Sequence, residues 1–386
     1  MSIVPAAAPH TKWSRVVLIA IAAAAIVGVV LLAFTWAGIT SSAKNIPLAV
    51  TGPDAQVQAL EKALEDKAGG TFTITAVASR DAATALIRSR DAYGAVVLGQ
   101  APEVLTASAN GTAVSQILTG VAQQLQTQIN QAAAAAGPAA AAGHPAPVAP
   151  KVTLTDVVPL AAADSKGTGL ALAAFPLAFG GMIGGILVSL MVVGNRRRLG
   201  TLALYSILAG GLIVLVMQGL YGVLQGNAML NGLGAGLALL GTSSLIVGLN
   251  ALIGTAGIPV GAVTTMLIAN PISAATAPMQ FLPEPWGAIG QWFVPGASTT
   301  LLRDLSYFPD ANTLFPWLVL AGWTIAGVMF TLAGHFRNQE VVHIEGSLDP
   351  EPVLARATPA TATRSRPRTA QGNPQHEKDS SENRDR

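Results

Sequence analysis

The sequence contains no cysteine, and residues 199–283 contain no Asp, Glu, Lys or Arg. Without cysteine the chain has no disulfide bond, no thiol nucleophile and no thiolate metal site. A charge-free run of this length excludes a soluble fold for this part of the chain, because soluble proteins carry about 25% charged residues. One helix crosses the hydrocarbon core in roughly 20 residues, so the run must hold several membrane spans joined by turns.

The rest of the composition agrees with a membrane protein. Of 386 residues, 51% are hydrophobic and 11% are charged, and the charges flank the apolar runs. We expect an α-helical polytopic membrane protein with six transmembrane helices and a small α/β extracytoplasmic domain inserted between the first two. The expected spans are residues 16–39 and then, approximately, 168–193, 199–224, 230–253, 258–279 and 315–336.

Basic residues set the expected orientation. Lys12 and Arg15 precede the first span, and Arg196, Arg197 and Arg198 follow the second. Because positive charge concentrates on the cytoplasmic side, both flanks should lie in the cytoplasm, in a multi-pass protein of the plasma membrane with both termini cytoplasmic. The alternative for the first span is a cleaved signal peptide, but its apolar run is longer than the apolar region of a signal peptide, which has about 7 to 15 residues.

Residues 1–15 form the expected cytoplasmic N-terminus, and residues 40–136 the extracytoplasmic domain. Alternating and apolar runs predict strands at 46–50, 71–77, 92–98 and 103–109, with helices at 56–67 and 81–90. A further helix over 112–136 has one apolar stripe, which either covers the sheet or makes a dimer contact. Residues 137–167 are an Ala- and Pro-rich linker, and residues 337–386 a disordered cytoplasmic tail.

The membrane domain, residues 168–336, is rich in glycine. Glycines four apart in 180–185 and 232–236 allow close helix packing, within the chain or between subunits. Its candidate polar groups are Asn231, Asn250 and Asn270, which either join helices or line an aqueous path. The segment of about 280–314 has too many prolines for a span and too many aromatics for a hydrated loop, so we expect an interfacial re-entrant segment there.

Reactive groups are missing from the membrane domain. It offers no nucleophile and base, no paired carboxylates and no metal ligands, and no lysine of the chain follows a glycine as the Walker A motif requires. We therefore expect no enzyme activity, no cofactor, no metal and no nucleic-acid partner.

The order of parts resembles the type-two ABC exporter permeases, and among them the YhgE and Pip (phage infection protein) family. The most specific stretches are Asn270-Pro271-Ile272-Ser273, the Pro- and Trp-rich segment 281–296, Leu302-Arg303 and Tyr307-Phe308. The resemblance implies a homodimer or heterodimer in membrane lipid, a separate cytosolic ABC ATPase and export of an amphipathic or hydrophobic compound. It also implies that the short loop carrying Arg196, Arg197 and Arg198 contacts the ATPase. The alternative is a non-transporting scaffold or receptor that acts through the extracytoplasmic domain.

Arg303 is the only basic residue between Arg198 and Arg337. It either snorkels to the outer headgroups with Asp304 as its partner, or it pins a re-entrant hairpin that closes the outer end of the cargo path. In the second hypothesis Pro295 and Gly296 supply the bend between the two limbs of the hairpin.

Overall fold

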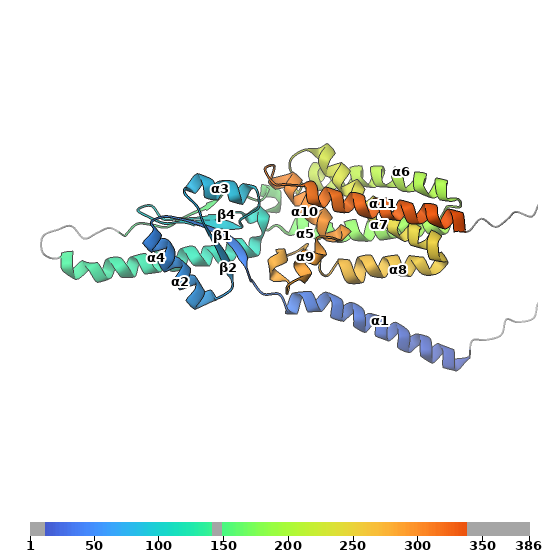
Figure 1. The fold of residues 1–386 in the computed structure, drawn as a ribbon, viewed down its shortest axis with the longest axis horizontal. Helices are drawn as coiled ribbons and strands as arrows, with labels where there is room; N and C mark the ends of the chain where they lie inside the picture. Colours follow the sequence, from blue (N-terminus) through green and yellow to red (C-terminus); the bar gives the residue numbers. More distant parts are fainter. Residues whose placement is uncertain (1–11, 141–148, 338–386) are drawn as a thin grey trace, which may run out of the picture. The chain divides into compact units, whose positions relative to one another are not determined.

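The computed structural model describes residues 12–140 and 149–337. The expected tail and most of the expected N-terminal segment lie outside the described residues, as does the middle of the expected linker. The described residues form an α/β domain and a set of long apolar helices (Figure 1).

A five-stranded sheet with the order β2-β1-β3-β4-β5 forms the centre of the α/β domain. Its strands are β1 (Ile46–Thr51), β2 (Phe72–Ala76), β3 (Gly94–Val97), β4 (Glu103–Thr106) and β5 (Thr153–Asp156). All neighbouring pairs are parallel except β3 and β4. Central strand β1 is buried on both faces, which accounts for its continuous apolar sequence IPLAVT.

Strand β5 lies inside the range 137–167 that the sequence indicated as a linker. Its sequence, Thr-Leu-Thr-Asp, is mostly exposed, so it carries little of the apolar signal by which strands are predicted. Pairing with β4 holds it in place, and the Asp156 carboxylate accepts hydrogen bonds from Ser108 N (3.1 Å) and Ser108 Oγ (2.5 Å). The α/β domain is therefore completed by chain that follows α4.

Three helices pack against this sheet: α2 (Asp54–Ala68), α3 (Arg80–Arg88) and α4 (Thr112–Ala140). Helix α3 begins where Ser79 Oγ accepts a hydrogen bond from Ala82 N (3.1 Å), which satisfies one of the free donors of the first turn. Val114 and Leu118 of α4 are buried in one cluster with the β-strand side chains. The apolar stripe of α4 therefore covers the sheet.

The apolar helices are α1 (Trp13–Ile39), α5 (Thr168–Met191), α6 (Asn195–Val214), α7 (Ala228–Ile253), α8 (Gly257–Val263) and α11 (Leu314–Arg337). π-helical turns extend α6 to Leu220 and α8 to Ala269. By length and composition, five helical stretches among the described residues could cross a membrane, and one of these, Ala228–Ala269, comprises both α7 and α8.

The stretch Ala228–Ala269 is a hairpin of two helices. Gly254 has φ 75°, a left-handed conformation that ends α7, and a Cβ on Gly261 would lie 2.7 Å from Ile246 of α7. Helix α8 thus folds back along α7 (Figure 1). The expected fifth span, 258–279, is helical only as far as Ala269, about 20 Å, because Pro271 and the residues after it leave the helix.

Helix α7 is the centre of the bundle and packs against α5, α6, α8, α10 (Val294–Tyr307) and α11. The glycine pairs face neighbours within this chain. A Cβ on Gly181 or Gly185 of α5 would lie 2.7 or 2.9 Å from α7 side chains, and one on Gly236 would lie 2.9 Å from Ser206 O of α6. These close approaches support packing within one chain over a subunit interface.

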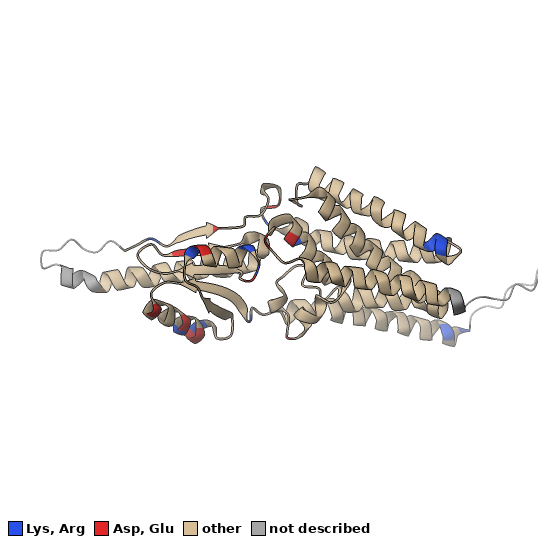
Figure 2. Cartoon of the chain, turned by 45° about the horizontal axis from the view of Figure 1, so that its top comes forward, with Lys and Arg blue, Asp and Glu red and all other residues tan. Residues whose placement is uncertain are grey.

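Figure 2 shows where the charges lie. The bundle is uncharged along most of its length, and basic residues mark the end where α1 and α6 begin. Charges of both signs are spread over the α/β domain, and a few lie where the domain meets the bundle. The bundle thus has the charge pattern of helices that cross a membrane.

Candidate functional site

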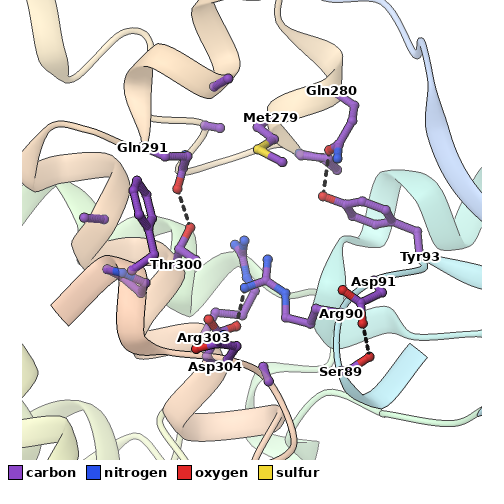
Figure 3. A pocket seen from close by; sticks show the side chains of 18 of the residues that line it. Ser89, Arg90, Asp91, Tyr93, Met279, Gln280, Gln291, Thr300, Arg303 and Asp304 are labelled. Atoms are coloured by element: carbon purple, nitrogen blue, oxygen red, sulfur yellow. Dashed lines mark hydrogen bonds and ion pairs between the residues drawn. The ribbon is translucent and has the colours of Figure 1, made fainter. Parts of the chain in front are cut away.

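A cavity of about 470 Å³ lies where the α/β domain meets the helical part of the chain (Figure 3). The turn after α3 contributes its wall on the domain side. The opposite wall comes from the segment 274–280, from α9 (Trp286–Gly290) and α10, and from the start of α11. The cavity has both charged and apolar walls, which is the composition expected for binding an amphipathic molecule.

Arg90 links the two walls. It leaves the end of α3 with φ 65°, a left-handed conformation that turns its side chain toward α10. Its guanidinium donates to Asn110 Oδ1 (3.0 Å) and to the Asp304 carboxylate, and it lies 5.4 Å from the centre of the Phe308 ring. The side chains of Arg90 and Asp304 are 15% and 5% exposed, so this ion pair is largely removed from water.

Arg303 also lines the cavity, one residue before Asp304. Its guanidinium donates one long hydrogen bond to Ala275 O (3.5 Å). The expected pairing of Arg303 with Asp304 is therefore replaced by the ion pair of Asp304 with Arg90. Although Arg303 is far from other arginines and lysines in the sequence, Arg90 of the α/β domain lines the same cavity.

Pro295 and Gly296 lie inside α10, as the second and third residues of its first turn. Proline is tolerated there because the first turn has no acceptor for its missing N–H. The bend comes earlier, at residues 290–293, where Phe293 N donates to Gly290 O (3.2 Å). A Cβ on Gly296 would lie 2.2 Å from Gly290 O, so this glycine permits close contact between α10 and the bend. The structure thus corrects the expected position of the turn.

Two further hydrogen bonds lie at the cavity, and the first of them joins its two walls. Tyr93 Oη donates to Gln280 Oε1 (2.8 Å), and Thr300 Oγ1 donates to Gln291 Oε1 (2.7 Å). Burial raises the pKa of the Tyr93 hydroxyl, so the proton that makes the first bond is retained at neutral pH. Tyr93 and Arg90 together join the α/β domain to the segments around α10.

The three candidate asparagines lie apart from this cavity. Asn231 is fully buried near the start of α7, where its Nδ2 donates to Gln218 Oε1 (3.0 Å) and Gln225 O (2.7 Å). Asn250 lies near the opposite end of α7, and Asn270 follows the last turn of α8. The structure does not bring them together, and Asn231 joins segments of its own chain.

The arginine triplet forms the first turn of α6 and is not a loop, because the connection from α5 is only residues 192–194. Arg198 folds back, and its guanidinium donates to Val192 O (2.8 Å) and Ser189 O (3.0 Å) at the end of α5. Arg196 and Arg197 are exposed. Arg198 therefore caps the end of α5, whereas the side chains of Arg196 and Arg197 are exposed to solvent.

Arg90, Tyr93 and Gln280 were not predicted from the sequence. Arg90 and Tyr93 lie about two hundred positions before α10 in the chain, and no local pattern distinguishes them from ordinary domain residues. One signal was available: Arg90 is the last residue of the predicted helix 81–90, two positions before a predicted buried strand.

The family comparison bears on residues 14–200. This range matches the model of the ABC-2 family transporter proteins. The match runs from α1 through the α/β domain and α5 into the first turn of α6, and it supports an ABC-2 type permease. Such permeases are membrane components that generally work with a separate ABC ATPase and are typically not catalytic themselves. Comparisons with curated proteins and with solved structures gave no match.

Proposed function

We propose that this protein is the permease subunit of an ABC exporter that moves an amphipathic or hydrophobic compound across the plasma membrane, with ATP hydrolysed by a separate cytosolic subunit. The observation that carries the proposal is the mixed polar and apolar cavity at one end of a helical bundle that is uncharged along most of its length. The family match over residues 14–200 supports the same function.

The proposal includes a topology. Six membrane segments, with α7 and α8 counted separately, place the N-terminus, the start of α6 and the end of α11 on the cytoplasmic side. Asn195 Nδ2 donates to Thr331 O (2.9 Å), which agrees with the start of α6 and the end of α11 lying on the same side. The α/β domain is then extracytoplasmic, and the cavity faces the outer leaflet.

Grouping within the family and assembly are part of the same proposal. The order of parts and the stretch from Asn270 to Phe308 favour the YhgE and Pip group. Helix α1 exposes apolar side chains on all sides, as a helix in contact with lipid or with a second permease subunit does. We propose a homodimer or heterodimer in membrane lipid.

We place the ATPase contact at the start of α6. Arg196 and Arg197 are exposed there on the proposed cytoplasmic side, while Arg198 holds the end of α5. The expected effect is that Arg196→Gln with Arg197→Gln lowers recovery of the ATPase and leaves the amount of permease in the membrane unchanged.

The test is affinity purification of the tagged chain from its native membranes, followed by mass spectrometry. A protein with a Walker A motif should co-purify with the wild type. Lys12→Gln with Arg15→Gln is the matched control, because it removes two exposed charges from the same proposed side of the membrane. Intact permease recovered repeatedly without any such ATPase would contradict the function, and equal recovery with both double variants would contradict the contact.

A further inference from the structure

A second cavity adjoins the one at the domain junction. It is an apolar groove of about 450 Å³ along α11, lined by Leu318, Val319, Gly322, Trp323 and Ala326 and by Trp292 and Phe315. Trp292 and Phe315 also line the junction cavity, and their rings meet edge to face with centroids 5.0 Å apart. The two cavities therefore adjoin at this aromatic pair.

The charges of the junction cavity favour an anion. Arg90 and Asp304 are taken up by their mutual ion pair, and Asp91 lies at the exposed rim, where it accepts from Ser89 Oγ (2.6 Å). Arg303 has five N–H donors and, among the described residues, one hydrogen bond, of 3.5 Å. A planar fork with free donors matches a carboxylate or a phosphate.

The groove along α11 matches an alkyl chain. It carries no charged side chain, and Gly322 leaves open space on it, since a Cβ there would have no neighbour within 4 Å. Each volume lies within the range of about 300 to 1,000 Å³ that is usual for small-molecule sites. A chamber with charged groups on its walls that adjoins one apolar groove matches one head group and one tail.

We propose that the two cavities form one binding site for a single-chain amphiphile with an anionic head group. The head group pairs with Arg303, and the tail passes Trp292 and Phe315 and lies along α11. This site rests on the proposed export function, for which it names the class of compound, but binding itself requires neither ATP nor a partner.

The test uses the full chain in nanodiscs of zwitterionic lipid and two probes of equal length, 11-bromoundecanoate and 11-bromoundecanol. Bromine on the tail quenches tryptophan fluorescence, and saturable quenching that is lost when Trp292 and Trp323 are both replaced by Phe reports a tail in this groove. The anionic probe should bind about tenfold or more tightly than the alcohol, because hydrogen bonds to charged groups contribute about 1.5–3 kcal/mol.

Variants separate the head from the tail. Arg303→Gln should remove the preference for the anionic probe and leave binding of the alcohol unchanged, and Arg303→Lys should retain only part of the preference. Gly322→Leu should fill the groove and weaken both probes. The matched control is Arg88→Gln, which removes an exposed charge from α3 outside the junction cavity and should change nothing.

Equal affinity for the two probes, or an anionic preference that survives Arg303→Gln, would overturn the proposal. Because retained binding of the alcohol shows that the variant is folded, a loss of anionic preference alone is specific to the head group. Saturable binding without ATP-driven transport would leave the site standing and count against the export function. ATP-driven transport without saturable binding of these probes would count against this site alone.

Discussion

Asp304→Asn should loosen the junction between the α/β domain and α10. The substitution keeps the shape of the side chain but removes the negative charge that lies beside Arg90 and Arg303. Both cations then remain in a largely buried cavity without a carboxylate between them. Loss of one partner from a buried ion pair costs roughly 3–5 kcal/mol. Because Arg90 is still 15% exposed, we expect the low end of that range.

Arg90→Met should cost less than Asp304→Asn. In this variant Asp304 keeps Arg303 as a neighbouring cation, so the carboxylate is not left alone. Replacement of a buried pair by apolar residues is often close to neutral. The double variant Arg90→Met with Asp304→Leu should therefore lose less stability than the sum of the losses in Arg90→Met alone and Asp304→Leu alone.

Hydrogen exchange measured by mass spectrometry on the full chain in nanodiscs is the assay. Opening of the junction should expose amides in the turn 89–93 and in the segment 274–281. A loss of about 3 kcal/mol corresponds to exchange more than a hundredfold faster in Asp304→Asn. Asp310→Asn, an exposed carboxylate six positions on, is the matched control. Exchange within about twofold of this control, or a larger effect of Arg90→Met, would refute the reasoning.

Three further predictions concern packing, pH and topology. Gly327→Ala should lower the melting temperature, because its Cβ would lie 2.4 Å from the α7 backbone, while Gly322→Ala should not; equal melting temperatures would count against this helix contact. The hydrogen bond from Arg80 lowers the pKa of Glu103. The ion pair therefore stabilises the fold above the ordinary Glu pKa of 4.5, and this stabilisation is lost as the pH falls from 4.5 through the lowered pKa of the folded protein. Glu103→Gln should make acid unfolding less steep in that range, and an unchanged profile would be evidence against the pair. The cysteine of Asp66→Cys, at an exposed position of the α/β domain, should react with a membrane-impermeant thiol reagent in intact cells. Protection from the reagent would show that the proposed topology is inverted.

Much of the fold follows from local pattern. The apolar run of β1 and the cap at Ser79 place these elements closely, since burial and capping act within a few residues. Strand β5 was not predicted because three of its four residues are polar, its one apolar residue, Leu154, is exposed, and the strand depends on pairing with β4. The linker interpretation failed there for lack of any local apolar signal.

The candidate site was harder to predict. Arg303 stood out because its stretch of chain is almost free of charge, and it does line a cavity. Its surroundings could not be read from the sequence, because the carboxylate next to it in the chain pairs with Arg90 from another domain. Long-range pairings of this kind leave no local periodicity. Pro295 and Gly296 were assigned a bend that falls at residues 290–293, because a proline is equally compatible with a turn and with the first turn of a helix.

Transport in inside-out membrane vesicles tests the central claim most directly. Vesicles from cells that contain this chain and its ATPase should accumulate a fluorescent single-chain anionic amphiphile when ATP is added. They should not do so with a non-hydrolysable ATP analogue, and vesicles that lack only this chain should not do so either. Equal accumulation with and without the chain would contradict the account of this protein as an export permease.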